Sequence, residues 1–323
     1  MESLGDVYPK YTPKGIRIEE LSIPSSRPNT VRLSTLLLRR DDAASPPEHV
    51  VLYCQGIYSS FPPLSSHVGK GFIIPFIIFS GNAGNPLHRI PVFATLLNAV
   101  PSLAILAPAP RSYWTSSTAR PTQAGLTADY AGALAFAASR FPTSRLTIYG
   151  HSLGATIALC LLAPYAHVSN EAPTAAVHGL VLENAFTSVP DMVRTLYPQR
   201  WLPYRYLGPF VCDRWDASAA AAAHVFPRNL ARRAMVLVSE RDEVVPPAMG
   251  WEIFNALRLR ASGGMSEDGE RRCVAGESRE PLGRFVVLEG ALHEDAWRYR
   301  NWSRAMQQYL EGLQHVPINE HLV

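Results

Sequence analysis

One stretch of the 323-residue chain decides its fold: Leu146-Thr147-Ile148-Tyr149-Gly150-His151-Ser152-Leu153-Gly154-Ala155. An apolar, strand-like run ends at a glycine, a serine follows between two glycines, and a helix of small residues begins at once. This G-x-S-x-G spacing is typical of a nucleophile elbow, in which a tight strand-to-helix turn presents a serine hydroxyl. Side chains at Gly150 and Gly154 would collide with the neighbouring strand and helix. Ordinary glycine-rich turns also match the five residues, so their meaning depends on the elements around them.

Apolar, β-branched runs alternate with helical patterns along most of the chain. We expect strands at residues 15–21, 30–38, 50–54, 103–107, 146–149, 179–182, 235–238 and 285–288. We expect helices at residues 90–100, 124–140, 152–162, 247–257 and 294–313. The first two strands have no helix between them and should pair antiparallel. The alternation of the others predicts an α/β fold, with a mostly parallel sheet covered by helices on both faces.

Composition excludes several classes of protein. The chain is 47% hydrophobic and 18% charged, which suits a globular enzyme with a large buried sheet. Its net charge is +3 and its Lys and Arg residues are scattered, so we expect no nucleic-acid partner. The four cysteines form no C-x-x-C pair, which argues against a disulfide framework. No secretory signal is visible, and a cytoplasmic or a membrane-associated location both stay open.

The expected organisation is an N-terminal segment with the antiparallel strands (1–48), a main α/β domain (49–316) and a short tail (317–323). Two stretches of the main domain interrupt the alternation and read as additions to it. Residues 186–230 are aromatic and proline-rich, then alanine-rich, and we interpret them as a small lid. Residues 261–281 are rich in glycine, serine and charge, and we expect a mobile surface loop there.

A third stretch, residues 57–80, separates a strand from the loop that should follow it. The strand at 50–54 ends in Gln55-Gly56, yet the glycine-rich loop Gly81-Asn82-Ala83-Gly84-Asn85 comes only after this stretch. Its apolar core, residues 72–79, contains Pro75 and is too short to span a membrane. It is either a buried strand leading into Gly81 or an insertion. We favour an insertion, such as a retained intron, because residues 50–54 already supply the strand.

A serine nucleophile needs a base, and the base needs an orienting acid. In enzymes that carry a nucleophile elbow on an α/β sheet, these three residues each follow a strand, and along the chain they come in the order serine, acid, histidine. Asp242 follows the expected strand at 235–238 and is our choice of acid, with Glu240 and Glu243 as alternatives. Of the ten histidines, His293 alone lies in a loop directly after the last expected strand. We therefore expect Ser152, Asp242 and His293 to form the catalytic group.

Acyl transfer also needs two N–H donors for the developing oxyanion. Leu153 directly follows the serine at a helix N-terminus, where unpaired N–H groups and the positive dipole end gather. The second donor should come from the glycine-rich loop, where we choose Asn82 and keep Ala83 as the competitor. The same loop lacks the spacing of a phosphate-binding loop.

Five runs together resemble the α/β-hydrolase superfamily, in particular its bud-emergence type of serine hydrolases. They are Gly81–Asn85 with His88-Arg89, the elbow at 150–154, Leu182-Glu183-Asn184-Ala185-Phe186-Thr187-Ser188, Asp242-Glu243-Val244-Val245-Pro246-Pro247 and His293-Glu294-Asp295-Ala296-Trp297. The resemblance covers most of residues 50–313. It implies an eight-stranded hydrolase fold and the triad Ser152, Asp242 and His293. Members are often tethered to membranes by an N-terminal helix, and their physiological substrates are mostly unsettled.

The chain departs from this family in three places. No N-terminal membrane helix is visible. The His-Gly pair before the oxyanion asparagine is Ser80-Gly81 here, or Gln55-Gly56 across the extra segment. The tyrosine- and glycine-rich loop after the fourth strand is replaced by Pro108-Ala109-Pro110-Arg111-Ser112-Tyr113-Trp114. These differences bear on membrane attachment, on oxyanion geometry and on the shape of the pocket.

These residues favour a serine esterase or thioesterase that acts on a small-molecule or lipid-like acyl ester through an acyl-enzyme. We expect Trp201 and Tyr204 of the lid, with Tyr113, to line the substrate pocket. No metal or organic cofactor is expected. Two alternatives stay open: a catalytically weak or inactive scaffold, because the oxyanion loop is interrupted, and a serine peptidase on the same triad. Peripheral membrane association and the oligomeric state are also open.

Overall fold

The computed structural model of this chain describes residues 13–27, 30–43, 46–55, 85–165, 176–199, 201, 206, 211–263 and 283–316. Their strands are β1 (Ile16–Pro24), β2 (Arg32–Arg40), β3 (His49–Cys54), β4 (Leu103–Pro108), β5 (Arg145–His151), β6 (Val177–Glu183), β7 (Ala234–Ser239) and β8 (Arg284–Leu288). Their α-helices are α2 (Ile90–Ala99), α3 (Gln123–Arg140), α4 (Leu153–Tyr165), α5 (Val189–Leu196), α6 (Ala217–Ala222), α7 (Arg228–Arg233), α8 (Pro247–Ser262) and α9 (Arg300–Gly312). Short 3₁₀ helices are η2 (Pro86–Arg89), η6 (Ala296–Arg298) and η7 (Leu313–His315).

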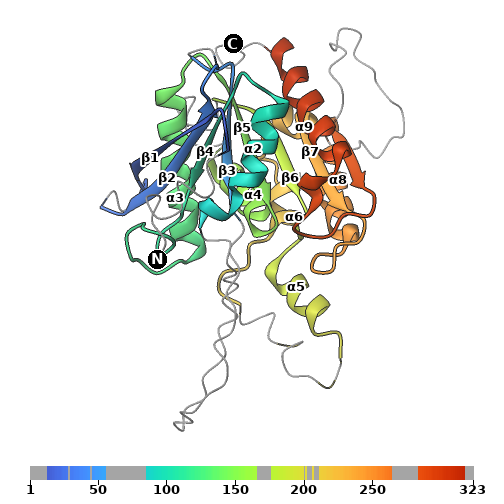
Figure 1. Cartoon of the computed structure of the whole chain (residues 1–323). Helices are drawn as coiled ribbons and strands as arrows, with labels where there is room; N and C mark the ends of the chain where they lie inside the picture. The colour runs from blue at the N-terminus through green and yellow to red at the C-terminus, as the bar shows by residue number, and fades with distance from the viewer. Residues whose placement is uncertain are drawn as a thin grey trace.

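The eight strands form one sheet in the order β1-β2-β4-β3-β5-β6-β7-β8 (Figure 1). β2 runs antiparallel to β1 and to β4, and the remaining neighbours are parallel. The predicted antiparallel start and mostly parallel sheet are therefore confirmed. The carboxyl ends of the parallel strands meet at one edge, which is where sites of open α/β sheets form.

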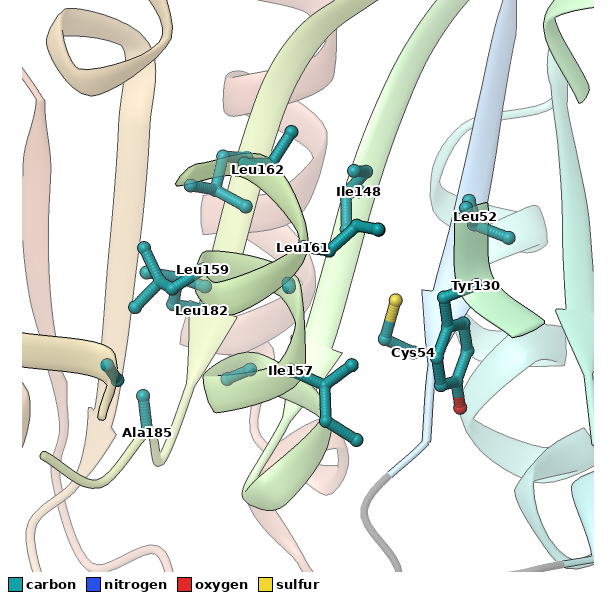
Figure 2. Packing of buried hydrophobic residues seen from close by; sticks show 14 of the residues in the cluster. Leu52, Cys54, Tyr130, Ile148, Ile157, Leu159, Leu161, Leu162, Leu182 and Ala185 are labelled. Carbon is teal, nitrogen blue, oxygen red and sulfur yellow. The ribbon is translucent and has the colours of Figure 1, made fainter. Parts of the chain in front are cut away.

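Two hydrophobic clusters cover the two faces of the sheet, as predicted for a three-layer α/β fold. Alternate residues of the central strands point to opposite faces. Leu52, Ile148 and Leu182 belong to the cluster under α3, α4 and α8, and Figure 2 shows them facing the buried side chains of α4. Val51 and Tyr149 belong to the other cluster, under α2 and α9. Both faces are buried, which is why the central strands read as continuous apolar runs.

β3 holds a central position, hydrogen-bonded to β4 on one side and to β5 on the other. Residues 57–80 lie outside the described part of the chain. The ends of the interruption meet, because Gln55 Nε2 donates to the Asn85 carbonyl oxygen at 3.3 Å. Among the described strands, β3 itself therefore occupies the place beside β5.

The other additions to the sheet are partly described. Within residues 186–230 the chain forms α5, then α6 at the predicted alanine-rich run, then α7, and α5 lies at the carboxyl edge of the sheet, away from the body (Figure 1). The expected loop at 261–281 begins later, because α8 continues to Ser262 and ends at Gly263 with a φ of 88°. The rest of that loop and the tail at 317–323 lie outside the described residues. No helix among the described residues has the length and apolar character needed to cross a bilayer.

Candidate active site

Ser152 occupies the turn between β5 and α4. Its φ is 55°, in the left-handed region that a serine adopts only when the surrounding structure imposes it. Its N–H donates to the Glu183 carbonyl oxygen at the end of β6, at 2.8 Å. The residue is only 4% exposed. The strained backbone at this serine matches the geometry of a nucleophile elbow.

The two glycines of the elbow allow the helix to approach the sheet closely. A Cβ on Gly154 would lie 2.0 Å from the Cys54 carbonyl oxygen at the end of β3. A Cβ on Gly150 would lie 2.4 Å from the Ala155 Cα in α4. Real Cβ atoms do not come this close to backbone, so any larger residue would push α4 away from the strands. This close packing explains both glycines of the motif.

Asp242 and His293 lie in the loops after β7 and β8 and form a hydrogen bond. Asp242 Oδ2 lies 2.7 Å from His293 Nδ1, and both side chains are 1% exposed. The other carboxylate oxygen accepts from the N–H groups of Val244 and Val245, at 2.8 and 2.7 Å. Since the carboxylate oxygen accepts, His293 Nδ1 is the donor, and in a neutral imidazole Nε2 is then the nitrogen that can accept a proton. Within the described residues, this buried Nε2 has no hydrogen-bond partner.

Glu240 and Glu243, the alternative acids, bind backbone rather than the imidazole. Glu240 Oε2 accepts from the Gly290 N–H at 2.8 Å, and Glu243 Oε2 accepts from the His293 N–H at 3.1 Å. The loops after β7 and β8 are therefore held together by side chains on both sides of the Asp242–His293 bond. This geometry favours Asp242 over both glutamates as the partner of the imidazole.

The carbonyl oxygen of His293 accepts from two buried side chains, Asn184 Nδ2 at 3.1 Å and His151 Nε2 at 2.9 Å. Burial, followed by the charge of Arg89, lowers the pKa of His151 to about 3, so its ring is neutral. Asn184 was not among the residues expected at the site. Its position could have indicated such a role, because it directly follows a strand and belongs to the run 182–188 that resembles the hydrolase family.

An ion pair joins η2 to the loop that carries His293. Arg89 Nη1 lies 2.6 Å from Glu294 Oε2, with the arginine nearly buried and the glutamate half exposed. Burial would raise the pKa of Glu294, but the charge of Arg89 and its hydrogen bond to the carboxylate hold that pKa below its usual range. Ligand atoms of His151, His293 and Glu294 lie within 4.8 Å of one another. Because Arg89 already neutralises this carboxylate and would repel a cation, we assign no metal to the group.

The oxyanion side of the site is described in part. Leu153 is the first residue of α4, so its N–H lies at a helix N-terminus beside Ser152. Asn82 and Ala83, the candidates for the second donor, lie outside the described residues. The described chain resumes at Asn85, whose Oδ1 accepts from the Leu87 N–H at 3.0 Å. Asn82 therefore stays a prediction.

Of the three residues expected to line the pocket, the structure describes Tyr113 and Trp201. Tyr113 is half-buried in the loop after β4 and packs against both hydrophobic clusters, and burial raises its pKa to about 12. Its neighbours Ser112 and Trp114 have φ angles of 66° and 48°. Trp201 is 79% exposed, and Tyr204 lies outside the described residues. The lining of a pocket by Trp201 and Tyr204 stays a prediction.

Known proteins resemble this chain in sequence and in fold. No family model matches the chain. It is 26% identical to "Protein bem46" of Schizosaccharomyces pombe over 243 residues, which are 75% of this chain and 70% of that protein. It is 26% identical to the alpha/beta hydrolase domain-containing protein WAV2 of Arabidopsis thaliana, over 68% of this chain and 64% of that protein. The second match thus spans slightly less than two thirds of its relative.

Solved structures show the same fold at low sequence identity. An esterase of Pyrococcus furiosus covers 96% of this chain and 94% of its own with a TM-score of 0.58 and 14% identity. Carboxyl esterase 2 of Tuber melanosporum covers 94% of this chain and 86% of its own with a TM-score of 0.57 and 12% identity. The chain therefore has the fold of the α/β-hydrolase superfamily and is similar in sequence to bem46-type α/β-hydrolase-domain proteins.

Proposed function

We propose that this chain is a serine hydrolase that cleaves an acyl ester or thioester through an acyl-enzyme on Ser152. One observation carries the proposal: His293 Nδ1 lies 2.7 Å from the buried Asp242 carboxylate, and its buried Nε2 has no hydrogen-bond partner among the described residues. A histidine held by a carboxylate at Nδ1 can take up a proton at Nε2, as a general base must. The left-handed backbone at Ser152 supports the role of the serine.

In the first half of the reaction, Ser152 Oγ attacks the carbonyl carbon of the ester and its proton passes to His293 Nε2. Asp242 keeps the imidazole in the correct tautomer and stabilises the imidazolium that forms. The Leu153 N–H, and a second donor that we expect from Asn82, bind the oxyanion. The imidazolium then protonates the leaving alcohol or thiol, and the acyl group stays on Ser152.

In the second half, His293 takes a proton from water, and the resulting nucleophile attacks the acyl-enzyme. The tetrahedral intermediate collapses, the carboxylic acid leaves, and the proton returns to Ser152 Oγ. Every proton in this cycle moves through His293 Nε2. The cycle requires no metal or organic cofactor.

The substrate class follows from the surroundings of the site. Tyr113 follows β4, and residues 186–230, which are rich in aromatic residues, follow β6, so both come after strands that end at the carboxyl edge of the sheet. Such side chains suit the acyl chain of a small or lipid-like ester. Two of the solved structures with this fold are described as esterases. Peripheral association with a membrane would bring a lipid-like substrate to the same edge.

The test is covalent labelling by a fluorophosphonate probe, compared between wild type and Ser152→Ala. We expect wild type to be labelled on the peptide that contains Ser152, and the variant to lose labelling by at least about 10³-fold. Ser303→Ala is the matched control, because this serine lies on the exposed part of α9 and should not affect labelling. Equal labelling of Ser152→Ala would overturn the assignment.

The same experiment separates the alternatives. A folded wild type that the probe does not label would favour the scaffold. A labelled wild type that prefers peptides to esters in a substrate panel would favour the peptidase.

A further inference from the structure

The backbone of His293 is anchored by side chains rather than by regular secondary structure. The residue lies between β8 and η6, in a stretch without ladder hydrogen bonds of its own. Its N–H donates to Glu243 Oε2 at 3.1 Å. Its carbonyl oxygen accepts from Asn184 and from His151. Both polar backbone groups of the candidate base are therefore held by side chains, and the two that bind the carbonyl oxygen are buried.

Asn184 connects the ends of β6 and β7 to this loop. Its N–H donates to the Leu237 carbonyl oxygen at 2.9 Å. Its Oδ1 accepts from the Ser239 N–H at 2.8 Å, and its Nδ2 donates to Ser239 Oγ at 3.0 Å. The residue is 2% exposed and has a φ of 49°, a conformation that asparagine tolerates better than most residues. Its amide orientation is fixed, because one end faces an N–H and the other faces two oxygens.

His151 completes the anchor from the end of β5. A carbonyl oxygen can only accept, so His151 Nε2 must be the donor in their hydrogen bond. The ring lies beside that of His293, with centroids 5.0 Å apart. A neutral ring at this place supports the base without placing a competing positive charge beside it.

We propose that Asn184 and His151 are positioning residues that hold the His293 main chain so that its imidazole stays aligned with Ser152. This proposal rests on the proposed function. The Asp242 bond fixes one atom of the imidazole, and a shift of the main chain would still turn the ring about that atom. Two donors on the carbonyl oxygen, together with Glu243 on the N–H, prevent the shift. A displacement of the base by about 1 Å is enough to cost about 10²-fold in rate.

The experiment compares Asn184→Gly with Ser239→Ala. Glycine keeps the positive φ and removes the amide, whereas Ser239→Ala removes only the other partner of Nδ2 and leaves the bond to His293. We expect Asn184→Gly to lower the labelling rate at saturating probe by about 10²-fold, with half-saturation changed less than about threefold. Ser239→Ala should lose less than about fivefold. Equal losses in the two variants would overturn the proposal.

Two further variants test the positioning role independently of Asn184→Gly. Asn184→Asp preserves size and backbone preference but sets an oxygen against the His293 carbonyl oxygen, so it replaces Asn184→Gly if that variant does not fold. His151→Phe should reduce the labelling rate in the same way. The double variant of His151→Phe with Asn184→Gly should lose less than the product of the single losses, because both residues hold one carbonyl group. Losses that multiply would contradict a shared role.

An activity-independent measurement separates this proposal from the proposed function. The proton between His293 Nδ1 and Asp242 should give a downfield NMR signal in wild type, assigned by its loss in Asp242→Asn. We expect the signal to broaden or shift in Asn184→Gly and to persist in Ser239→Ala. If wild type is not labelled but the signal responds in this way, the serine hydrolase function fails and the positioning role stands. An unchanged signal in Asn184→Gly would refute the positioning role in either case.

Discussion

The two sides of the candidate site are attached to the sheet differently. The acid–base side consists of the loops after β7 and β8, and the expected oxyanion side consists of the junction between β3 and η2. On the acid–base side, Asp242 and His293 follow their strands directly and bond to each other. On the oxyanion side, β3 ends at Cys54 and the described chain resumes only at Asn85. Within the part of the chain that the structure describes, the Gln55 side chain joins the two ends by a hydrogen bond to the Asn85 carbonyl oxygen.

This difference shows which parts of such a site the sheet can place by itself. Parallel strands in register bring their carboxyl ends to one edge, so residues that follow them directly meet without further help. A donor on a long loop has no such constraint. Its position depends on how the two ends of the loop are closed, and ordering a longer loop costs more conformational entropy. We therefore expect the position of a donor on this loop, and with it the activity, to depend on the length of the loop.

The largest expected effect on activity comes from a substitution on the acid–base side. Asp242→Asn keeps an oxygen for the N–H groups of Val244 and Val245 but places an amide N–H against His293 Nδ1. The imidazole must then present the wrong tautomer, and we expect a loss of about 10⁴ in kcat with little change in the melting temperature. Steady-state hydrolysis of a short ester and thermal unfolding measure the two quantities.

Glu243→Gln is the matched control, because Glu243 binds the His293 N–H rather than its ring. It should cost much less activity than Asp242→Asn. If Glu243→Gln abolished turnover and Asp242→Asn did not, the acid would have to be reassigned.

The next largest effect is expected from a deletion on the oxyanion side. Deleting residues 57–81 leaves Gly56, Asn82, Ala83 and Gly84 between Gln55 and Asn85, a loop long enough to join ends that are already in contact. We expect the deletion to increase soluble yield, because it removes an apolar stretch, and to increase ester hydrolysis. If the full chain lacks one oxyanion donor, the gain in kcat should reach about 10²–10³-fold.

The control for this deletion is the same variant carrying Ser152→Ala, which shows whether the gained activity comes from this site. A deletion variant that is less soluble and less active than the full chain would mean that residues 57–81 are an integral part of the fold.

Much of the fold could be predicted because its signals are local. Apolar runs, helical periodicity and the glycines of the elbow each depend on a few neighbouring residues, and all eight strands form where they were expected. Strand ends were less accurate, since β5 extends through His151 and β1 through Pro24 as long as a partner strand continues. Pairing with neighbours in space decided those ends.

Parts of the site could not be predicted because they depend on which loops meet. Asn184 acts through the His293 carbonyl oxygen, which lies far along the sequence, and the Arg89–Glu294 pair joins η2 to the last loop. No periodicity signals such contacts. The order of serine, acid and histidine along the chain, by contrast, follows from the order of strands, and the structure places Asp242 and His293 together.

The smallest expected effect lies at the opposite end of β3, the strand that feeds the oxyanion side. His49 begins β3 and is fully buried, and neither ring nitrogen has a partner among the described residues. Burial, with the nearby charge of Arg145, lowers its pKa to about 4. In the unfolded chain the group titrates near 6.5, so the unfolded state takes up a proton first as the pH falls.

The contribution of His49 to stability is therefore complete above about pH 6.5 and is lost as the pH falls toward about 4. Between pH 7 and pH 4.5 wild type should lose about 2 kcal/mol more unfolding free energy than His49→Phe, which keeps an aromatic ring without a titrating group. Urea unfolding at the two pH values measures the difference, and taking it between the two proteins cancels the similar contribution of the buried His151. Because His49 lies at the end of β3 remote from Ser152, ester hydrolysis at pH 7 should be nearly equal in the two proteins. Equal acid sensitivity of wild type and His49→Phe would show that protonation of His49 does not weaken this strand.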